Sequence, residues 1–331
     1  MTGRKRTRHG SEYPYAVYLL RSTVTDSELT VIVPTRERPG LLKETVESIV
    51  ASARAASDKL GATVRVLVVD DASPTESTRE AVAALGAEAA AAGSAVSVDY
   101  ARVEVHDGRK DPGAAIALGV SLATSRYLTI FGDDDIMLPE HITLHLRNMR
   151  GGADVSAASY YITDGQLNRQ YAKRRRPAHL GDLLIGRIDV NDGAFVRTDL
   201  IQAVELDPAL LAQMLYPVWA TLLIDGRKFV YSRTPSFLYR RHDANISSVN
   251  KDAEDAALRT SLQEKYRALA SEKLGAVPEP RKVDWARHKR EWRYSKKGYV
   301  RWRMAATELA VKRNPVVRKA FRMPPLPPKE S

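Results

Sequence analysis

Short runs of aliphatic and β-branched residues alternate with stretches of helical periodicity through the first half of the chain. The runs Leu29–Val33 and Val64–Val69 are predicted to be buried strands, because strands covered on both faces are apolar throughout. Between them, apolar residues recur at helical spacing: Leu41, Leu42, Val46, Ile49 and Val50. The alternation continues to about residue 150, and it predicts a parallel, doubly wound α/β sheet.

Polar clusters follow the predicted strands at the points where they end. The stretches are "PTRER" from residue 34, "DDAS" from residue 70 and "GDDD" from residue 132. In open α/β sheets, ligands bind beyond the carboxyl ends of the strands, near the point where strand order reverses. The sequence therefore predicts a binding site built from these three clusters.

Three adjacent aspartates, Asp133, Asp134 and Asp135, form the most unusual of these clusters. One aspartate would suffice to cap the helix expected near Pro139, and this local role is one interpretation. The other is a hard divalent cation, because Mg²⁺ and Mn²⁺ prefer oxygen ligands and often combine one or two carboxylates with substrate phosphates. A cation would also offset the repulsion between the carboxylates.

Several classes of site are excluded or disfavoured by the sequence. The chain has no cysteine, which rules out disulfides, thiolate metal ligands and a thiol nucleophile. "GRKDPGAA" has glycines at Walker-like spacing, but Ala114 and Ala115 stand where lysine and Ser/Thr are required. The phosphates of any bound nucleotide are therefore expected to contact a metal and cationic side chains. His141 and His145 are four residues apart on a predicted helix, where packing or surface roles are favoured over a shared metal.

The positive charge of the chain is concentrated at its C-terminus. Of a net charge of +11, residues 281–331 contribute 16 basic and 4 acidic side chains, so the rest is close to neutral. Trp285, Trp292 and Tyr299 are spaced by seven within this region, which keeps them near one helical face. Three interpretations stay open: docking on the main domain, contact with anionic lipid, or contact with a polyanion such as nucleic acid or glycan.

Three segments are expected: a basic N-terminal arm and docking segment over 1–27, a main α/β domain over 28–250, and a helical, strongly basic extension over 251–331. No apolar run approaches the roughly 20 residues that span a bilayer. We expect a cytoplasmic protein without a transmembrane segment, with peripheral contact at the inner face of the membrane as one use of the tail.

Four stretches in order resemble family 2 glycosyltransferases. They are "TVIVPTRERPGLLKETVESI", "VRVLVVDDASPTEST", "SRYLTIFGDDDIMLPEH" and "YRRHDANIS", and the resemblance covers about residues 28–250. It implies a GT-A type Rossmann-like doubly wound mixed sheet with a C-terminal helical extension. It also implies inverting transfer of a sugar from a nucleoside-diphosphate sugar, with UDP as the default, to an acceptor hydroxyl, with Mg²⁺ or Mn²⁺ as cofactor.

The resemblance also assigns expected roles to residues. It implies that the nucleotide sugar contacts Pro34, Thr35, Arg36, Glu37, Asp70, Asp71, Asp133 and Arg241. It implies that the cation contacts Asp134, Asp135 and His242.

The chain departs from the family pattern at the catalytic base. The family commonly carries Glu-Asp about a dozen residues before the stretch that matches "GRKFVY", whereas this chain has Met214 and Leu215. Neither side chain can accept a proton, so Asp192 is the substitute base candidate and Asp207 a weaker one. Each of the two also fits a plain loop residue. The departure keeps an alternative open, namely a sugar-nucleotide-binding protein with weak or no catalysis.

Overall fold

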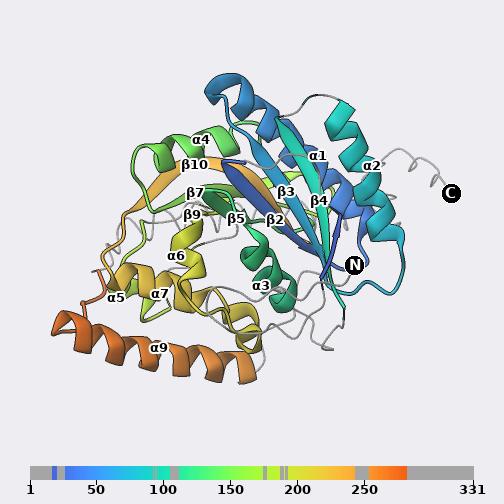
Figure 1. Cartoon of the computed structure of the whole chain (residues 1–331). Coiled ribbons are helices and arrows are strands. Elements are labelled where there is room, and N and C mark those ends of the chain that lie inside the picture. The colour runs from blue at the N-terminus through green and yellow to red at the C-terminus, as the bar shows by residue number, and fades with distance from the viewer. Residues whose placement is uncertain are drawn as a thin grey trace, which may run out of the picture.

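The computed structural model of the chain describes residues 17–20, 27–91, 93, 95–104, 112–173, 177–186, 190, 193–242 and 253–281. In these residues, ten strands form one mixed sheet (Figure 1). The strands are β1 (Val17–Leu20), β2 (Leu29–Thr35), β3 (Val64–Asp70), β4 (Val96–Val103), β5 (Tyr127–Ile130), β6 (Ile136–Met137), β7 (Val155–Thr163), β8 (Arg169–Lys173), β9 (Phe195–Arg197) and β10 (Phe229–Arg240).

The helices cover both faces of the sheet. They are α1 (Pro39–Leu60), α2 (Ser77–Ala91), α3 (Gly113–Leu122), α4 (His141–Arg150), α5 (Leu180–Leu183), α6 (Thr198–Gln202), the 3₁₀ helix η1 (Pro208–Gln213), α7 (Tyr216–Ile224) and α9 (Ala253–Leu274). Figure 1 shows α1, α2 and α4 on one side and α3, α6, α7 and α9 on the other, and the two sides bury separate hydrophobic clusters. None of the helices in the described ranges is long and apolar enough to cross a membrane.

The strand order is β1-β4-β3-β2-β5-β9-β7-β10-β6, with β8 beside β7. The four strands β4, β3, β2 and β5 are parallel, and the order reverses between β2 and β5. β9 is antiparallel to both of its neighbours, while β10 runs parallel to β7. This mixed, doubly wound arrangement confirms the predicted fold class.

Period-two alternation distributes each central strand over both cores. In β3, Val64, Val66 and Val68 face the cluster under α1 and α2, whereas Leu67 and Val69 face the cluster around α3. Because both faces are covered, the strand needs apolar residues at every position, and this produces the uninterrupted run in the sequence.

Both predicted flanking segments make contacts with the central body. β1 pairs antiparallel with β4 along the sheet edge. α9 packs against α7 and places Leu262, Tyr266 and Ala270 in the core cluster around α3. The segment boundaries at residues 27 and 250 stay predictions, and the basic tail from residue 282 onward lies outside the described residues.

Candidate active site

The carboxyl ends of β3, β2 and β5 meet at one edge of the sheet, where the strand order reverses. Thr35 at the end of β2 is in register with Asp70 at the end of β3. Ile130 ends β5 opposite Ile32, and the backbone N–H of Phe131 donates to the Ile32 carbonyl. The three polar clusters predicted from the sequence therefore lie side by side, in the position where α/β sheets bind ligands.

Asp133 is anchored in this edge by residues from the end of β2. Thr35 Oγ1 donates to Asp133 Oδ2 at 2.7 Å, and Arg38 Nη1 lies 3.3 Å from Asp133 Oδ1. The residue is only 7% exposed. Burial raises the pKa of Asp133 to about 6, and the charge of Asp134 adds to this, against the contacts with Thr35 and Arg38. The carboxylate thus stands in a site that disfavours further negative charge.

Asp134 connects the aspartate cluster to the far end of the domain. His242 Nε2 lies 2.9 Å from Asp134 Oδ2, and Arg38 Nη1 lies 3.5 Å from the same oxygen. His242 follows β10, so more than a hundred residues of chain separate the two partners. The return of β10 to the sheet edge is what brings an imidazole to the carboxylates.

Asp135 makes a different set of contacts. Its Oδ1 accepts a hydrogen bond of 2.9 Å from the backbone N–H of Arg240, and its carbonyl accepts one from Thr45 Oγ1 of α1, also at 2.9 Å. Arg240 in turn pairs with Glu44 of α1 at 2.5 Å. Asp135 therefore ties the end of β10 to α1 and fixes the approach of His242, and its role as a metal ligand stays a prediction.

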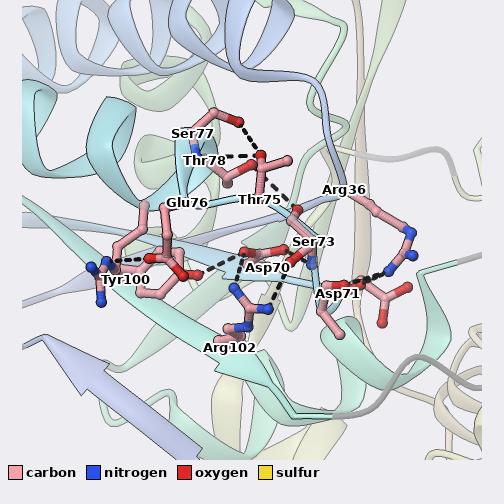
Figure 2. A network of polar contacts seen from close by, with 12 residues as sticks. Arg36, Asp70, Asp71, Ser73, Thr75, Glu76, Ser77, Thr78, Tyr100 and Arg102 are labelled. Atoms are coloured by element: carbon pink, nitrogen blue, oxygen red, sulfur yellow. Dashed lines mark hydrogen bonds and ion pairs between the residues drawn. The ribbon is translucent and has the colours of Figure 1, made fainter.

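Asp70 lies inside a polar network at the end of β3 (Figure 2). Its carboxylate is completely buried and accepts hydrogen bonds from Tyr100 Oη at 2.7 Å and from the backbone N–H of Ser73 at 2.9 Å. Arg102 Nη1 lies 3.6 Å from the same side chain, and Arg102 Nη2 donates to the Ser73 carbonyl at 2.6 Å. These contacts fix the loop that follows β3.

Arg36 also acts on this loop. Its Nη1 donates to the carbonyls of Asp71 and Ala72 at 2.5 and 2.7 Å, and the backbone N–H of Asp71 donates to the Thr35 carbonyl. Asp71 is buried beside the end of β2. The guanidinium of Arg36 and the backbone of β2 together set the position of Asp71.

Two residues of the site adopt left-handed backbone conformations without being glycine. Glu37 has φ of 51° and Ala72 has φ of 50°. The backbone N–H of Glu37 donates to Ser73 Oγ, and its carboxylate accepts from the Thr75 backbone and hydroxyl. Such conformations persist only where the surroundings hold them, which is typical of ligand-binding loops.

The ligand types in the cluster suit a divalent cation that is shared with a bound diphosphate. Within the residues described here, no group of three or more His, Asp or Glu side chains is arranged to hold a metal ion. Asp134 and His242 do meet, with Asp133 beside them. Mg²⁺ is commonly bound by one or two carboxylates together with substrate phosphates and water, so two or three protein ligands fit this mode.

The candidate bases have different surroundings. Asp192 lies outside the described residues, but the backbone N–H of Gly193 donates to the Ile130 carbonyl at 2.7 Å, directly before the aspartate cluster. Asp207 is exposed beside η1. Met214 is 2% exposed within the core around α3, and Leu215 packs against the same core.

Other predicted residues can now be placed. Arg241 is exposed, and its backbone N–H donates to the Thr163 carbonyl. His141 and His145 are completely buried and lie with ring centroids 4.5 Å apart, so they pack in the core. The contacts of Arg38 were not predicted from the sequence. Its position, three residues after the end of β2 and directly before α1, does place it at the edge where the polar clusters meet.

This fold and this edge define a glycosyltransferase of the GT-A class. The chain belongs to glycosyl transferase family 2, whose model matches residues 30–199. A structure of residues 1–349 of TarS from S. aureus is similar with a TM-score of 0.50 and 14% identity, covering 72% of this chain and 71% of that one. The same TarS fragment in complex with UDP-GlcNAc gives a TM-score of 0.53 at 14% identity, covering 76% and 68%. No curated protein sequence shows significant similarity to the chain.

Proposed function

We propose that the protein transfers a sugar from a nucleoside-diphosphate sugar to an acceptor hydroxyl, with inversion at the anomeric carbon and with Mg²⁺ or Mn²⁺ as cofactor. The observation that carries the proposal is the meeting of Thr35, Asp133, Asp134 and His242 at the edge where the strand order reverses. UDP is the default nucleotide, since the similar TarS structure is a complex with UDP-GlcNAc.

The loop after β3 would bind the nucleoside. We assign hydrogen bonding to the base to Asp71, whose position is set by Arg36 and β2. Asp70 would hold the loop in position and would not contact the base itself, because its carboxylate is already bonded to Tyr100 and to the Ser73 backbone. Pro34 and Glu37 would line the same pocket, and Asp133 would stand nearest the ribose or the phosphates.

Asp134 and His242 would hold the cation, with Asp135 as a further candidate ligand. When bound, a divalent ion acts as a Lewis acid that stabilises the negative charge developing on the departing diphosphate. Arg241, exposed beside His242, is assigned to the phosphates. The protein's own contribution is to keep these ligands in place: Thr35 orients Asp133, and the Asp135 contact with Arg240 fixes the strand end that carries His242.

Inversion requires a base on the face of the sugar opposite the diphosphate. The acceptor hydroxyl gives its proton to a carboxylate, its oxygen bonds to the anomeric carbon, and the bond from that carbon to the diphosphate oxygen breaks. We assign the base to Asp192, supported by the hydrogen bond that holds the next residue, Gly193, to the end of β5. Asp207 is the weaker candidate.

The deciding experiment combines donor binding with product analysis. Purified full-length protein is screened by thermal shift against nucleotides and nucleotide sugars, with and without Mn²⁺, since a ligand that binds the native state raises the melting temperature. The stabilising donor is then offered with simple glycoside acceptors, and the anomeric configuration of the product is read by NMR. A product that retains the donor's configuration, or no stabilisation by any donor, would overturn the proposal.

A second function is favoured by one observation, the burial of Met214 in the core where relatives commonly carry an acidic pair. In that case the protein binds a sugar nucleotide with little or no transfer. Tight donor binding without product, unaltered by Asp192→Asn, would support this alternative. A loss of transfer in Asp192→Asn with donor binding retained would support the enzyme.

The basic tail suggests where the protein works. We propose that residues 281–331 bring it to an anionic surface, with the inner face of the cytoplasmic membrane as the first candidate and a polyanion such as nucleic acid as the second, because 16 basic residues stand there against 4 acidic ones. Sedimentation with phosphatidylserine vesicles and with double-stranded DNA, using the full chain and a chain ending at residue 281, separates the two. Binding to neither would remove this part of the proposal.

A further inference from the structure

Arg38 occupies an unusual place in the aspartate cluster. It is the last residue before α1, and its guanidinium is directed away from the helix toward the end of β5. One nitrogen, Nη1, lies 3.3 Å from Asp133 Oδ1 and 3.5 Å from Asp134 Oδ2. A single cationic group therefore lies close to both carboxylates and offsets part of their negative charge.

Arg38 and a divalent ion would compete for the negative charge of Asp134. Mg²⁺ lies about 2.0–2.1 Å from its oxygen ligands, so an ion bound to Asp134 Oδ2 would sit in the space that Nη1 borders, 3.5 Å from the same oxygen. Two positive groups at that separation repel each other strongly in a partly buried site. Arg38 is only 25% exposed, so water does little to screen this repulsion.

His242 and Arg38 both approach the same oxygen of Asp134. His242 contacts Asp134 Oδ2, and Arg38 approaches that atom at 3.5 Å. Withdrawal of Arg38 would leave that oxygen to His242 and to an incoming ion. A diphosphate offers the withdrawn guanidinium a new partner, because arginine pairs well with phosphate oxygens.

We infer that Arg38 is a resident counter-ion of Asp133 and Asp134 that competes with the divalent cation and is released by the diphosphate of the donor. This inference rests on the proposed function and deepens it, since it makes cation binding depend on donor binding. The protein alone then binds the cation weakly, and the donor and the cation bind in a coupled way.

The test measures Mn²⁺ binding without any nucleotide. Free Mn²⁺ is titrated by electron paramagnetic resonance against the full-length wild type, Arg38→Gln, Arg38→Lys and Lys43→Gln. Loss of one charge-assisted contact changes an equilibrium by roughly tenfold, so Arg38→Gln is expected to bind Mn²⁺ about tenfold more tightly than the wild type. Arg38→Lys keeps the charge and Lys43→Gln removes a charge from an exposed position on α1, so both are expected to resemble the wild type.

Unchanged or weaker Mn²⁺ binding in Arg38→Gln would overturn the inference, and so would a similar gain in Lys43→Gln. If Arg38→Gln does not fold, the wild type decides the question: Mn²⁺ affinity must rise when UDP is added, and an affinity independent of UDP overturns the inference. The first arm contains no donor, so its failure is distinct from failure of the proposed transfer reaction, which is read from product formation.

Discussion

The three aspartates at the end of β5 are neighbours in sequence but make different contacts. Asp133 binds Thr35, Asp134 faces His242, and Asp135 accepts the backbone N–H of Arg240. Like charges at adjacent positions are tolerated because each carboxylate contacts a different donor and because Arg38 lies close to the first two. Asp133 and Asp134 contact side chains at the sheet edge, whereas the Asp135 carboxylate accepts a hydrogen bond from the backbone of β10.

Asp134→Asn is the sharpest change to the proposed chemistry. The amide keeps the shape of the side chain but removes the charge that faces His242 and the expected cation. Removal of one group that stabilises developing charge lowers turnover by roughly 10²–10³-fold. The measurement is the initial rate of sugar transfer at saturating donor, with Asp58→Asn, an exposed aspartate of α1, as the matched control. Full activity in Asp134→Asn would show that this carboxylate takes no part in the reaction.

Asp135 offers a contrast between two substitutions. Asparagine can still accept the hydrogen bond from the Arg240 backbone, whereas alanine leaves that buried N–H without its partner, at a cost of about 1–3 kcal/mol. We expect urea unfolding to show a near-normal free energy of unfolding for Asp135→Asn and a reduced one for Asp135→Ala. Transfer by Asp135→Asn as poor as that of Asp134→Asn would instead indicate a metal ligand at position 135.

At the scale of elements, α3 packs unusually close to β2. A Cβ atom added at Gly119 would lie 2.5 Å from Ile32 Cγ2 and 3.2 Å from Val69 Cγ2. These distances explain why a glycine stands inside a helix, where it is otherwise unfavourable. The close approach holds β2, and with it Thr35, against the α3 side of the core.

Gly119→Ala should therefore destabilise the protein. Overpacking of a filled core costs about 1–3 kcal/mol, which exceeds the gain of about 1 kcal/mol from replacing glycine in a helix. Gly40→Ala in α1 is the matched control, because a Cβ there meets nothing within 4 Å. Urea unfolding should separate the two variants in opposite directions. Equal stability of both would mean that α3 can shift away from β2 at little cost.

The buried histidines of α4 give the stability a pH dependence. Complete burial lowers the pKa of His141 to about 3 and that of His145 well below its ordinary value. Their described partners are the hydroxyls of Ser236 and Ser156 and the rings of Phe131, Phe195 and Phe237, none of which is charged. Helix α4, which follows the aspartate loop, therefore packs against the core through two neutral imidazoles.

The direction of the effect follows from these lowered values. Below about pH 6.5 the unfolded chain binds protons that the buried histidines do not bind, so the free energy of unfolding is highest above about pH 6.5 and decreases as the pH falls. The slope approaches about 1.4 kcal/mol per pH unit for each histidine. His145→Phe should reduce the slope between pH 5 and 6.5 in urea unfolding. An unchanged slope would assign the acid sensitivity to other groups.

The sequence predicts the central elements well because their signals are local. Uninterrupted apolar runs identify β2 and β3, and the polar residues after them mark the binding edge. The two-residue strand β6 and the antiparallel β9 lack such a signal, because pairing with distant strands and not their own pattern defines them. At the site, Thr35, Asp133, Asp134 and His242 were all named from the sequence and do come together. The engagement of Arg38 and Asp135 depends on side-chain direction, which spacing alone does not give.

At the scale of the whole molecule, the chain after α9 is fastened to α5. Asp182 is 3% exposed and accepts the Arg281 backbone N–H at 3.0 Å and its Nε at 2.6 Å. Arg281 Nη2 also donates to the Pro177 carbonyl. A Cβ at Gly181 would lie 2.5 Å from the carbonyls of Pro278 and Glu279, so this backbone lies directly on the helix.

Arg281→Ala should loosen this attachment measurably. It leaves the buried carboxylate of Asp182 without its charged partner, which costs about 1–3 kcal/mol after allowance for the partly exposed guanidinium. Lys273→Ala removes the exposed pair with Asp225 and is expected to cost less than about 1 kcal/mol. Limited proteolysis should cut after α9 sooner in Arg281→Ala than in Lys273→Ala. Identical digestion would show that the attachment contributes little.

Because Arg281 is bonded to Asp182 of α5, the fifty residues that follow it begin at a defined place on the molecule. Any partner that those residues bind is therefore tethered to the part of the molecule that carries α5 and Pro177.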